Sequence, residues 1–348
     1  MAAVHLTVIM ATKGSLMLNT AVLLDREMEA RVFLPADLER IAACTSLSRA
    51  DEEALTPARQ VEQLAQTDIA ITGWGTHAIT EAHLDQALGL QLICHSAGSI
   101  HHLVPPSAGK RGICVSTARA ALATGVAEFA FGMMLTAMKG AWLFQRAAAE
   151  GKWRDEELMP FVREPYGAVI GIIGASCAGR EMLRLCRVLD NAAVLLYDPY
   201  VDEAEALALG AEKVALEALM TRSDVVSLHA PATKETYHMI NSVNLGLMKD
   251  RAIFINTARG ACVDETALIE RLEAGRILAC LDVTDPEPPA PESLLYTLPN
   301  CILTPHIAGA IKENTHRQGR LVADEIQAFA AGKPLKHAID FDELNRLA

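Results

Sequence analysis

Three residues of different chemical types each follow a short apolar run: Arg259, Glu287 and His306. A cation can hold a carboxylate and polarise a carbonyl, and an imidazole can give or take a proton near neutral pH, tuned by a carboxylate. Together they supply the cation, the proton donor and the tuning carboxylate that reduction of a 2-keto acid needs. Taken singly, each is more commonly a surface ion pair, a loop charge or a hydrogen-bonded loop histidine. Their common placement after apolar runs favours the catalytic interpretation.

A second candidate site is the turn that follows the apolar run Ala168–Ile173 and contains Gly174, Ser176, Gly179 and Arg180. Gly174 permits a tight turn, Gly179 allows a helix to approach the strand, and the helix N-terminus offers N–H groups to a pyrophosphate. Ser176 replaces the middle glycine of the dinucleotide pattern G-x-G-x-x-G, although its hydroxyl could donate to a phosphate. An ordinary strand-to-helix turn and an incomplete G-x-S-x-G nucleophile elbow are the alternatives.

A carboxylate lies at the distance along the chain that a dinucleotide site requires. Asp198 ends the apolar run Val194–Tyr197, nineteen residues after Gly179. In such sites a carboxylate accepts hydrogen bonds from the adenosine ribose and would repel a 2′-phosphate. A turn-forming Asp before Pro199 is the alternative. The spacing favours NAD as the cofactor.

These residues must be positioned by strands, and the second half of the chain contains six strand-like runs separated by helical patterns. Six strands with intervening helices predict a doubly wound parallel sheet, which binds ligands at the carboxyl ends of its strands. The runs are Ala168–Ile173, Val194–Tyr197, Val225–Leu228, Ala252–Ile255, Leu278–Leu281 and Ile302–Leu303.

The first half of the chain shows the same alternation and predicts a second parallel α/β sheet. Helix candidates near 37–44, 58–66 and 80–88 separate the runs, and Thr80 is suited to cap the last of them. The strand-like runs are His5–Met10, Ile69–Thr72, Leu92–Cys94 and Ile113–Val115.

Between the two halves, the segment from about Arg119 to Phe144 is predicted to be helical and is apolar nearly all round. Such a helix must be buried on several sides. It is either a core helix between two layers or part of the interface of a symmetric homodimer.

Length, charge and cysteine content limit the classes of protein to consider. The 348 residues suffice for two domains, and a net charge of -12 argues against nucleic acid and membrane surfaces as partners. The eight cysteines form no CxxC pair, so we expect no metal site and no disulfide framework. The apolar run Leu6–Ala11 is short and has no preceding Lys or Arg, so no signal peptide is expected. We predict a cytoplasmic protein.

The chain resembles the D-isomer-specific 2-hydroxyacid dehydrogenases, the family of phosphoglycerate, glyoxylate/hydroxypyruvate and formate dehydrogenases. The resemblance covers about residues 60 to 320. It rests on the stretches GIIGASCAGR, LLYDPY, LHAPATKET, FINTARGACVDETAL, LDVTDPEP and TPHIAG, which occur in the family's order.

The resemblance implies a role for each matching residue. Arg259 would bind the substrate carboxylate, His306 would be the acid/base, and Glu287, preferred over Asp285, would be its partner. The remaining matches are Asp282 for the nicotinamide carboxamide, Thr257 and Ala258 along the nicotinamide, His229 and Pro231 on the adenosine side, and Ala97 and Gly98 in the loop that binds the substrate carboxylate.

The chain departs from the family pattern at Ser176 and again at His101 and His102, where many members carry Asn and Asp. An adjacent histidine pair could suggest a metal. Neighbours on one strand point to opposite faces, so packing and hydrogen bonding are the favoured interpretation. The role of this pair stays open.

The predicted architecture is a Rossmann NAD domain over 119–316, inserted into a flavodoxin-like substrate domain made of 1–118 and 317–348. The predicted function is NAD-dependent interconversion of a small 2-keto acid and its D-2-hydroxy acid, by a homodimer. An NAD(H)-sensing regulator on the same fold, like the family's corepressor branch, is the alternative. The particular acid and the physiological direction are left open.

Overall fold

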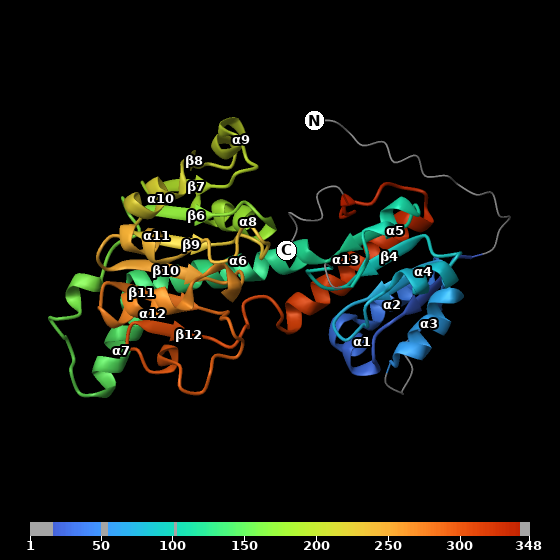
Figure 1. Ribbon diagram of the computed structural model, residues 1–348, viewed down its shortest axis with the longest axis horizontal. Helices are drawn as coiled ribbons and strands as arrows, with labels where there is room; N and C mark the ends of the chain where they lie inside the picture. The colour runs from blue at the N-terminus through green and yellow to red at the C-terminus, as the bar shows by residue number, and fades with distance from the viewer. Residues whose placement is uncertain (1–16, 50–54, 101–102, 342–348) are drawn as a thin grey trace. The chain divides into compact units, whose positions relative to one another are not determined.

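The computed structural model describes residues 17–49, 55–100 and 103–341. The chain divides into two compact units (Figure 1). Among the described residues, the first comprises 17–121 with 312–341, and the second comprises 122–311. Each unit contains one parallel sheet, which confirms the predicted class of two parallel-sheet α/β domains. The predicted strand His5–Met10 and the pair His101 and His102 lie outside the described residues.

The sheet of the first unit has five strands in the order β2-β1-β3-β4-β5, which is the flavodoxin-like order. Three of these strands match predicted runs, whereas β1 and β2 were not predicted. The strands are β1 (Asn19–Val22), β2 (Ser46–Ser48), β3 (Ile69–Thr72), β4 (Leu92–His95) and β5 (Cys114–Thr117).

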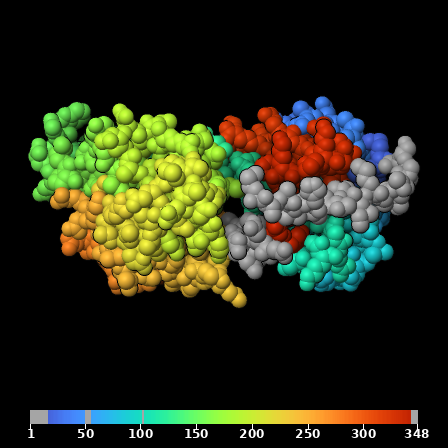
Figure 2. Space-filling view, turned by 90° about the horizontal axis from the view of Figure 1, so that it is seen from above, coloured from blue at the N-terminus to red at the C-terminus, as the bar shows by residue number. Residues whose placement is uncertain are grey.

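Helices cover this sheet, and those that cover one of its faces come from both ends of the unit's sequence. Val32, Ile41 and Ile326, from α1, α2 and α13, are buried against strand residues such as Ile71. Figure 2 shows the carboxyl-terminal segment, in red, beside amino-terminal segments in blue. The helices are α1 (Arg26–Val32), α2 (Pro35–Ala42), α3 (Pro57–Ala65), α4 (Glu81–Gln86), α5 (Ser107–Lys110) and α13 (Lys312–Ala330).

The sheet of the second unit has seven parallel strands in the order β12-β11-β10-β9-β6-β7-β8 (Figure 1). Six were predicted, and the two-residue edge strand β8 was not. The strands are β6 (Val169–Ile173), β7 (Ala193–Tyr197), β8 (Glu212–Lys213), β9 (Val225–Leu228), β10 (Ala252–Asn256), β11 (Ile277–Leu281) and β12 (Cys301–Leu303).

Both faces of this sheet are buried, as the near-continuous apolar runs of its strands require. In β10, Ile253 and Ile255 pack in a core with α6 and α8, whereas Phe254 packs in a core with α10, α11 and α12. The helices are α6 (Arg119–Met138), α7 (Ala141–Ala149), α8 (Cys177–Cys186), α9 (Glu203–Ala208), α10 (Leu216–Arg222), α11 (Ser242–Leu247) and α12 (Glu265–Glu273), with short 3₁₀ turns at Met159–Phe161, Gly260–Cys262 and Leu294–Tyr296.

The apolar segment predicted as one helix from Arg119 to about Phe144 is two helices in the structure. Gly140, at φ 63°, ends α6 and precedes α7. Among the described helices, α6 alone is long and apolar enough to cross a membrane by length and composition. Ala127 and Met134 are fully buried in the core beside the sheet. One face of α6 therefore packs in the core, which was the first of the two alternatives for this helix.

Candidate active site

The sequence-predicted residues of the second unit converge at one edge of its sheet. All strands are parallel, so their carboxyl ends lie on the same side, where open α/β sheets bind ligands. The residues that follow the strands are Gly174 after β6, Asp198 after β7, His229 after β9, Thr257 after β10, Asp282 after β11 and Thr304 after β12.

At two positions, in the turn after β6 and at the start of the helix that follows it, only glycine fits. Gly174 has φ 92°, and a Cβ there would lie 2.7 Å from the backbone nitrogen of Ala230. A Cβ at Gly179 would lie 2.0 Å from the carbonyl oxygen of Gly174. Helix α8 therefore begins almost in contact with the turn, and its free N–H groups form a cradle that fits a pyrophosphate.

Ser176 occupies the position of the missing glycine without strain, because its backbone is extended at φ -60° and ψ 175°. Its hydroxyl accepts a hydrogen bond from the Gly179 N–H at 3.3 Å, so it caps α8 and its own proton stays available to a phosphate. Arg180 donates from Nε to the Ala175 carbonyl at 2.9 Å and pairs with Glu205 at 2.7 Å. Both residues stabilise the turn.

Asp198 joins the end of β7 to the same turn. Its Oδ2 accepts from the Ala175 N–H at 2.7 Å, and its Oδ1 accepts from the Tyr200 N–H at 2.8 Å. Each carboxylate oxygen keeps a second lone pair for a further donor. The predicted ribose contact stays a prediction, and the geometry leaves room for it.

Two buried polar atoms at this edge have no hydrogen-bond partner among the described residues: His229 Nδ1 and Thr257 Oγ1. His229 Nε2 lies 2.9 Å from Ser227 Oγ, and burial lowers the pKa of the imidazole to about 4, so the ring is neutral at pH 7. Unpaired buried polar groups are unfavourable unless a ligand or water satisfies them. Both atoms are suited to face the polar groups of a dinucleotide.

Near Pro231 and Ala258, hydrogen bonds hold the predicted ligand-binding backbone in place. The Pro231 carbonyl accepts from Thr236 Oγ1 at 2.6 Å. Asn256 accepts from the Ala258 N–H and donates to the Arg259 carbonyl, both at 3.0 Å. Sequence reasoning did not assign Asn256, although an amide at a strand end is a usable signal.

Arg259 is half-buried, and its Nη1 donates to the Ala258 carbonyl at 2.6 Å. The next residue, Gly260, was also missed. A Cβ at Gly260 would lie 2.0 Å from the carbonyl carbon of Thr284, so the Arg259 turn packs directly on the loop that carries Glu287. A glycine directly after a candidate catalytic residue is the signal that could have indicated this contact.

The predicted imidazole and carboxylate form a pair. His306 Nδ1 lies 2.6 Å from Glu287 Oε1, and both side chains are nearly half exposed. A carboxylate can only accept, so Nδ1 carries the proton and Nε2 is left for proton transfer. The pairing of His306 with Glu287, which the resemblance favoured over Asp285, is present in the geometry.

Asp282 holds the loop that carries His306. Its Oδ1 accepts from Thr304 Oγ1 at 2.6 Å and from the Ile307 N–H at 3.0 Å, and its Oδ2 accepts from the Ala308 N–H at 2.8 Å. The side chain is buried, with 2% of the residue exposed. This loop contact was not predicted from the sequence.

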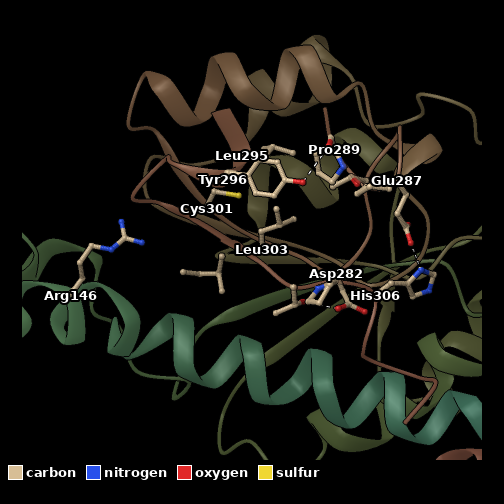
Figure 3. Close-up of a pocket in the computed structure, with 14 residues that line it drawn as sticks. Arg146, Asp282, Glu287, Pro289, Leu295, Tyr296, Cys301, Leu303 and His306 are labelled. Carbon is tan, nitrogen blue, oxygen red and sulfur yellow. Dashed lines mark hydrogen bonds and ion pairs between the residues drawn. The ribbon is translucent and has the colours of Figure 1, made fainter. Parts of the chain in front are cut away.

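Asp282, Glu287 and His306 line a cavity of about 660 Å³ (Figure 3). Tyr296 and Leu303 form part of its apolar wall, and Arg146 of α7 lies at the end away from His306 (Figure 3). The lining is completed by Thr284, Pro288, Pro289, Leu295, Cys301, Ile302, Thr304 and Pro305.

Ala97 and Gly98 belong to the first unit, in the loop after β4. The Ala97 carbonyl accepts from the Ala118 N–H at 3.1 Å. Beneath the loop, His95 Nδ1 lies 3.1 Å from Thr72 Oγ1, and the imidazole is hydrogen bonded to the Ser99 backbone. Burial lowers the pKa of His95 to about 4, so this ring is also neutral at pH 7.

We expect the two buried histidines to make the protein acid-sensitive. An unfolded chain takes up these protons below about pH 6.5, whereas the folded chain resists until about pH 4. Stability is therefore lost as pH falls through this window, by up to about 3 kcal/mol per histidine. Urea unfolding at pH 7 and pH 5 measures the loss of free energy of unfolding between the two pH values. His95→Gln should make this difference smaller. An unchanged difference in that variant would contradict the assignment of the loss to His95.

All eight cysteines are free thiols. Among residues 17–49, 55–100 and 103–341, no group of three or more His, Cys, Asp or Glu side chains could hold a metal ion.

A glycine cradle, a strand-end carboxylate and a His–Glu pair lie on one edge of a parallel sheet, the arrangement expected of a nicotinamide-dependent oxidoreductase. Residues 131–308 match the model of the D-isomer specific 2-hydroxyacid dehydrogenase NAD binding domain. The chain belongs to this family, and its cofactor is of the NAD type.

Its relatives include glyoxylate reductase of Korarchaeum cryptofilum, 34% identical over 88% of this chain and 94% of that protein. D-3-phosphoglycerate dehydrogenase of Archaeoglobus fulgidus is 34% identical over 75% of this chain, which spans about half (49%) of that protein's length. Among solved structures, apo D-mandelate dehydrogenase of Rhodotorula graminis is similar, with a TM-score of 0.78 and 25% identity over 93% of this chain and 98% of that one.

Proposed function

We propose that this protein reduces a small 2-keto acid to the D-2-hydroxy acid, or carries out the reverse oxidation, with His306 as the acid/base. The observation that carries the proposal is the 2.6 Å contact between His306 Nδ1 and Glu287 Oε1, at the same sheet edge as the glycine cradle. The relatives named glyoxylate reductase and hydroxypyruvate reductase support a small substrate.

NADH, when bound, supplies the hydride. Arg259 binds the substrate carboxylate and polarises the neighbouring carbonyl. Carboxylate binding by the backbone N–H groups of Ala97 and Gly98 stays a prediction from the family resemblance. His306 Nε2 gives its proton to the carbonyl oxygen, while Glu287 accepts from Nδ1 and keeps the ring oriented. Gly174, Ser176, Gly179 and Asp198 would hold the pyrophosphate and ribose. In oxidation the proton returns to Nε2.

A panel of 2-keto acids tests this function, with NADH consumption followed at 340 nm and the product resolved by chiral chromatography. We expect efficient turnover of at least one small 2-keto acid and a D product. Binding of NADH without turnover of any acid would instead favour the NAD(H)-sensing regulator.

We expect the protein to prefer NADH over NADPH, because the Asp198 carboxylate would repel a 2′-phosphate. Close like charges at a partly solvated site cost on the order of 1–4 kcal/mol, so NADPH should bind at least about tenfold more weakly. Fluorescence titration of both cofactors measures this. Asp198→Asn should reduce the difference in affinity between NADH and NADPH. The control Asp190→Asn, which removes an exposed carboxylate elsewhere, should leave this difference unchanged. Equal affinities in the parent would refute the prediction.

We further propose that the NAD domain spans 119–316, that the substrate domain comprises 1–118 and 317–348, and that the protein is a cytoplasmic homodimer. The division into two compact units supports the domain boundaries. The apolar side chains of α6 that are only partly buried, Phe129, Phe131 and Leu135, support a dimer interface. Analytical ultracentrifugation at micromolar concentration tests the dimer, and a monomer there would overturn it.

A further inference from the structure

Thr304 has no assigned role, and its hydroxyl has two oxygens within reach: the Leu281 carbonyl at 3.4 Å and, much closer, the Asp282 carboxylate. Its Oγ1 lies 2.6 Å from Asp282 Oδ1, and the Asp282 carboxylate, when ionised, can only accept. The hydroxyl therefore donates, and a donor to a charged acceptor makes a stronger hydrogen bond than a neutral pair. The Thr304 N–H donates to the Leu281 carbonyl at 2.9 Å, so both ends of the residue are tied to β11 and the residue after it.

The loop beyond Thr304 has an unfavourable backbone that needs such contacts. His306 has φ 52°, in the left-handed region that residues with a Cβ rarely adopt. Its N–H donates to the Asp282 carbonyl at 2.9 Å, and Ile307 and Ala308 donate to the Asp282 carboxylate at 3.0 and 2.8 Å. One buried residue thus holds both sides of the strained position.

We propose that Thr304 is a positioning residue: its hydroxyl fixes the Asp282 carboxylate, and Asp282 in turn fixes the His306 backbone and the direction of its imidazole. This inference rests on the proposed function, in which His306 Nε2 must meet a carbonyl oxygen. Thr304 lines the same cavity as Asp282 and His306, and it acts through Asp282 rather than through the substrate.

The test compares Thr304→Val, which keeps the shape without the hydroxyl, with Thr304→Ser, which keeps the hydroxyl. Thr221→Val is the matched control, because Thr221 donates only to the Glu217 carbonyl within helix α10. For the best 2-keto acid, we expect Thr304→Val to lower kcat about 10- to 100-fold, as a small misplacement of a catalytic group does. The Kd for NADH should stay within about twofold. Thr304→Ser should restore most of kcat, and the control should match the parent.

Hydrogen exchange of residues 304–308 provides a readout that does not depend on turnover. We expect faster exchange of the Ile307 and Ala308 amides in Thr304→Val and parent-like exchange in Thr304→Ser. If Thr304→Val does not fold, Thr304→Ala removes the hydroxyl without adding a methyl group and must show the same pattern.

Several results would overturn the inference. These are parent-like kcat and exchange in Thr304→Val, an equal loss in Thr304→Ser, or a loss of kcat that merely follows weaker NADH binding. A parent with no activity on any 2-keto acid would refute the proposed function instead. In that case unchanged exchange in Thr304→Val would still refute the positioning role, and faster exchange would support it.

Discussion

His306→Ala should lower kcat for 2-keto acid reduction by about 10²–10⁴, the range for loss of a general acid/base. Binding of NADH should change little, because the glycine cradle and Asp198 follow other strands of the sheet. Steady-state kinetics with the best acid of the panel, combined with NADH fluorescence titration, separates the two effects. Glu287→Gln can still bond to Nδ1 but lacks the charge, so its loss of kcat should be smaller than that of His306→Ala.

His77→Ala is the matched control, because it removes an exposed imidazole of the first unit that is hydrogen bonded to the Leu55 carbonyl. Its kinetics should match those of the parent. If His306→Ala left kcat within a few-fold of the parent, the proposed mechanism would be wrong, however well the fold matches the family.

Gly179→Ala should strongly impair NADH binding. The added Cβ would lie 2.0 Å from the carbonyl oxygen of Gly174, and backbone cannot yield as a flexible side chain can. Helix α8 must move away from the turn, which costs about 1–3 kcal/mol and removes its N–H groups from the pyrophosphate. The Kd for NADH should rise at least about 30-fold.

Gly246→Ala is the control, because a Cβ at this position in helix α11 meets nothing within 4 Å. It should leave NADH binding unchanged and raise the free energy of unfolding by about 0.5–1 kcal/mol, since Ala favours a helix over Gly. NADH titration and thermal unfolding of both variants measure the contrast. Parent-like NADH affinity in Gly179→Ala would show that the cradle is not the cofactor site.

Local sequence patterns were sufficient to predict most strands of the second unit's sheet. Apolar runs such as Ala252–Ile255 are continuous because both faces of a parallel strand are buried, and this signal does not depend on distant residues. Strand β8 was not predicted, because its two residues, Glu212 and Lys213, are both exposed and polar. Strands β1 and β2 of the first sheet were not predicted either, because β1 begins with the polar residues Asn19 and Thr20, and β2 has only three residues, of which Ser46 and Ser48 are exposed and polar.

The sequence also predicted that Arg259, Glu287 and His306 belong to one site, because the carboxyl ends of parallel strands meet at one edge. The roles assigned to these residues stay predictions. Sequence reasoning did not find the contacts that hold them: Asn256 beneath the Arg259 turn, Gly260 against Thr284, and Asp282 within the His306 loop.

The sequence by itself determined the fold class, the glycine turn and the strand-end residues, because each depends on periodicity or on spacing within a few residues. Only the tertiary structure decided which donor meets which acceptor. Glu287 and His306 are 19 residues apart, and Asp282 and Thr304 are 22 apart, yet each pair meets at 2.6 Å. Such contacts depend on how β11 and β12 pair and on the left-handed backbone at His306, and residue type does not encode either one locally.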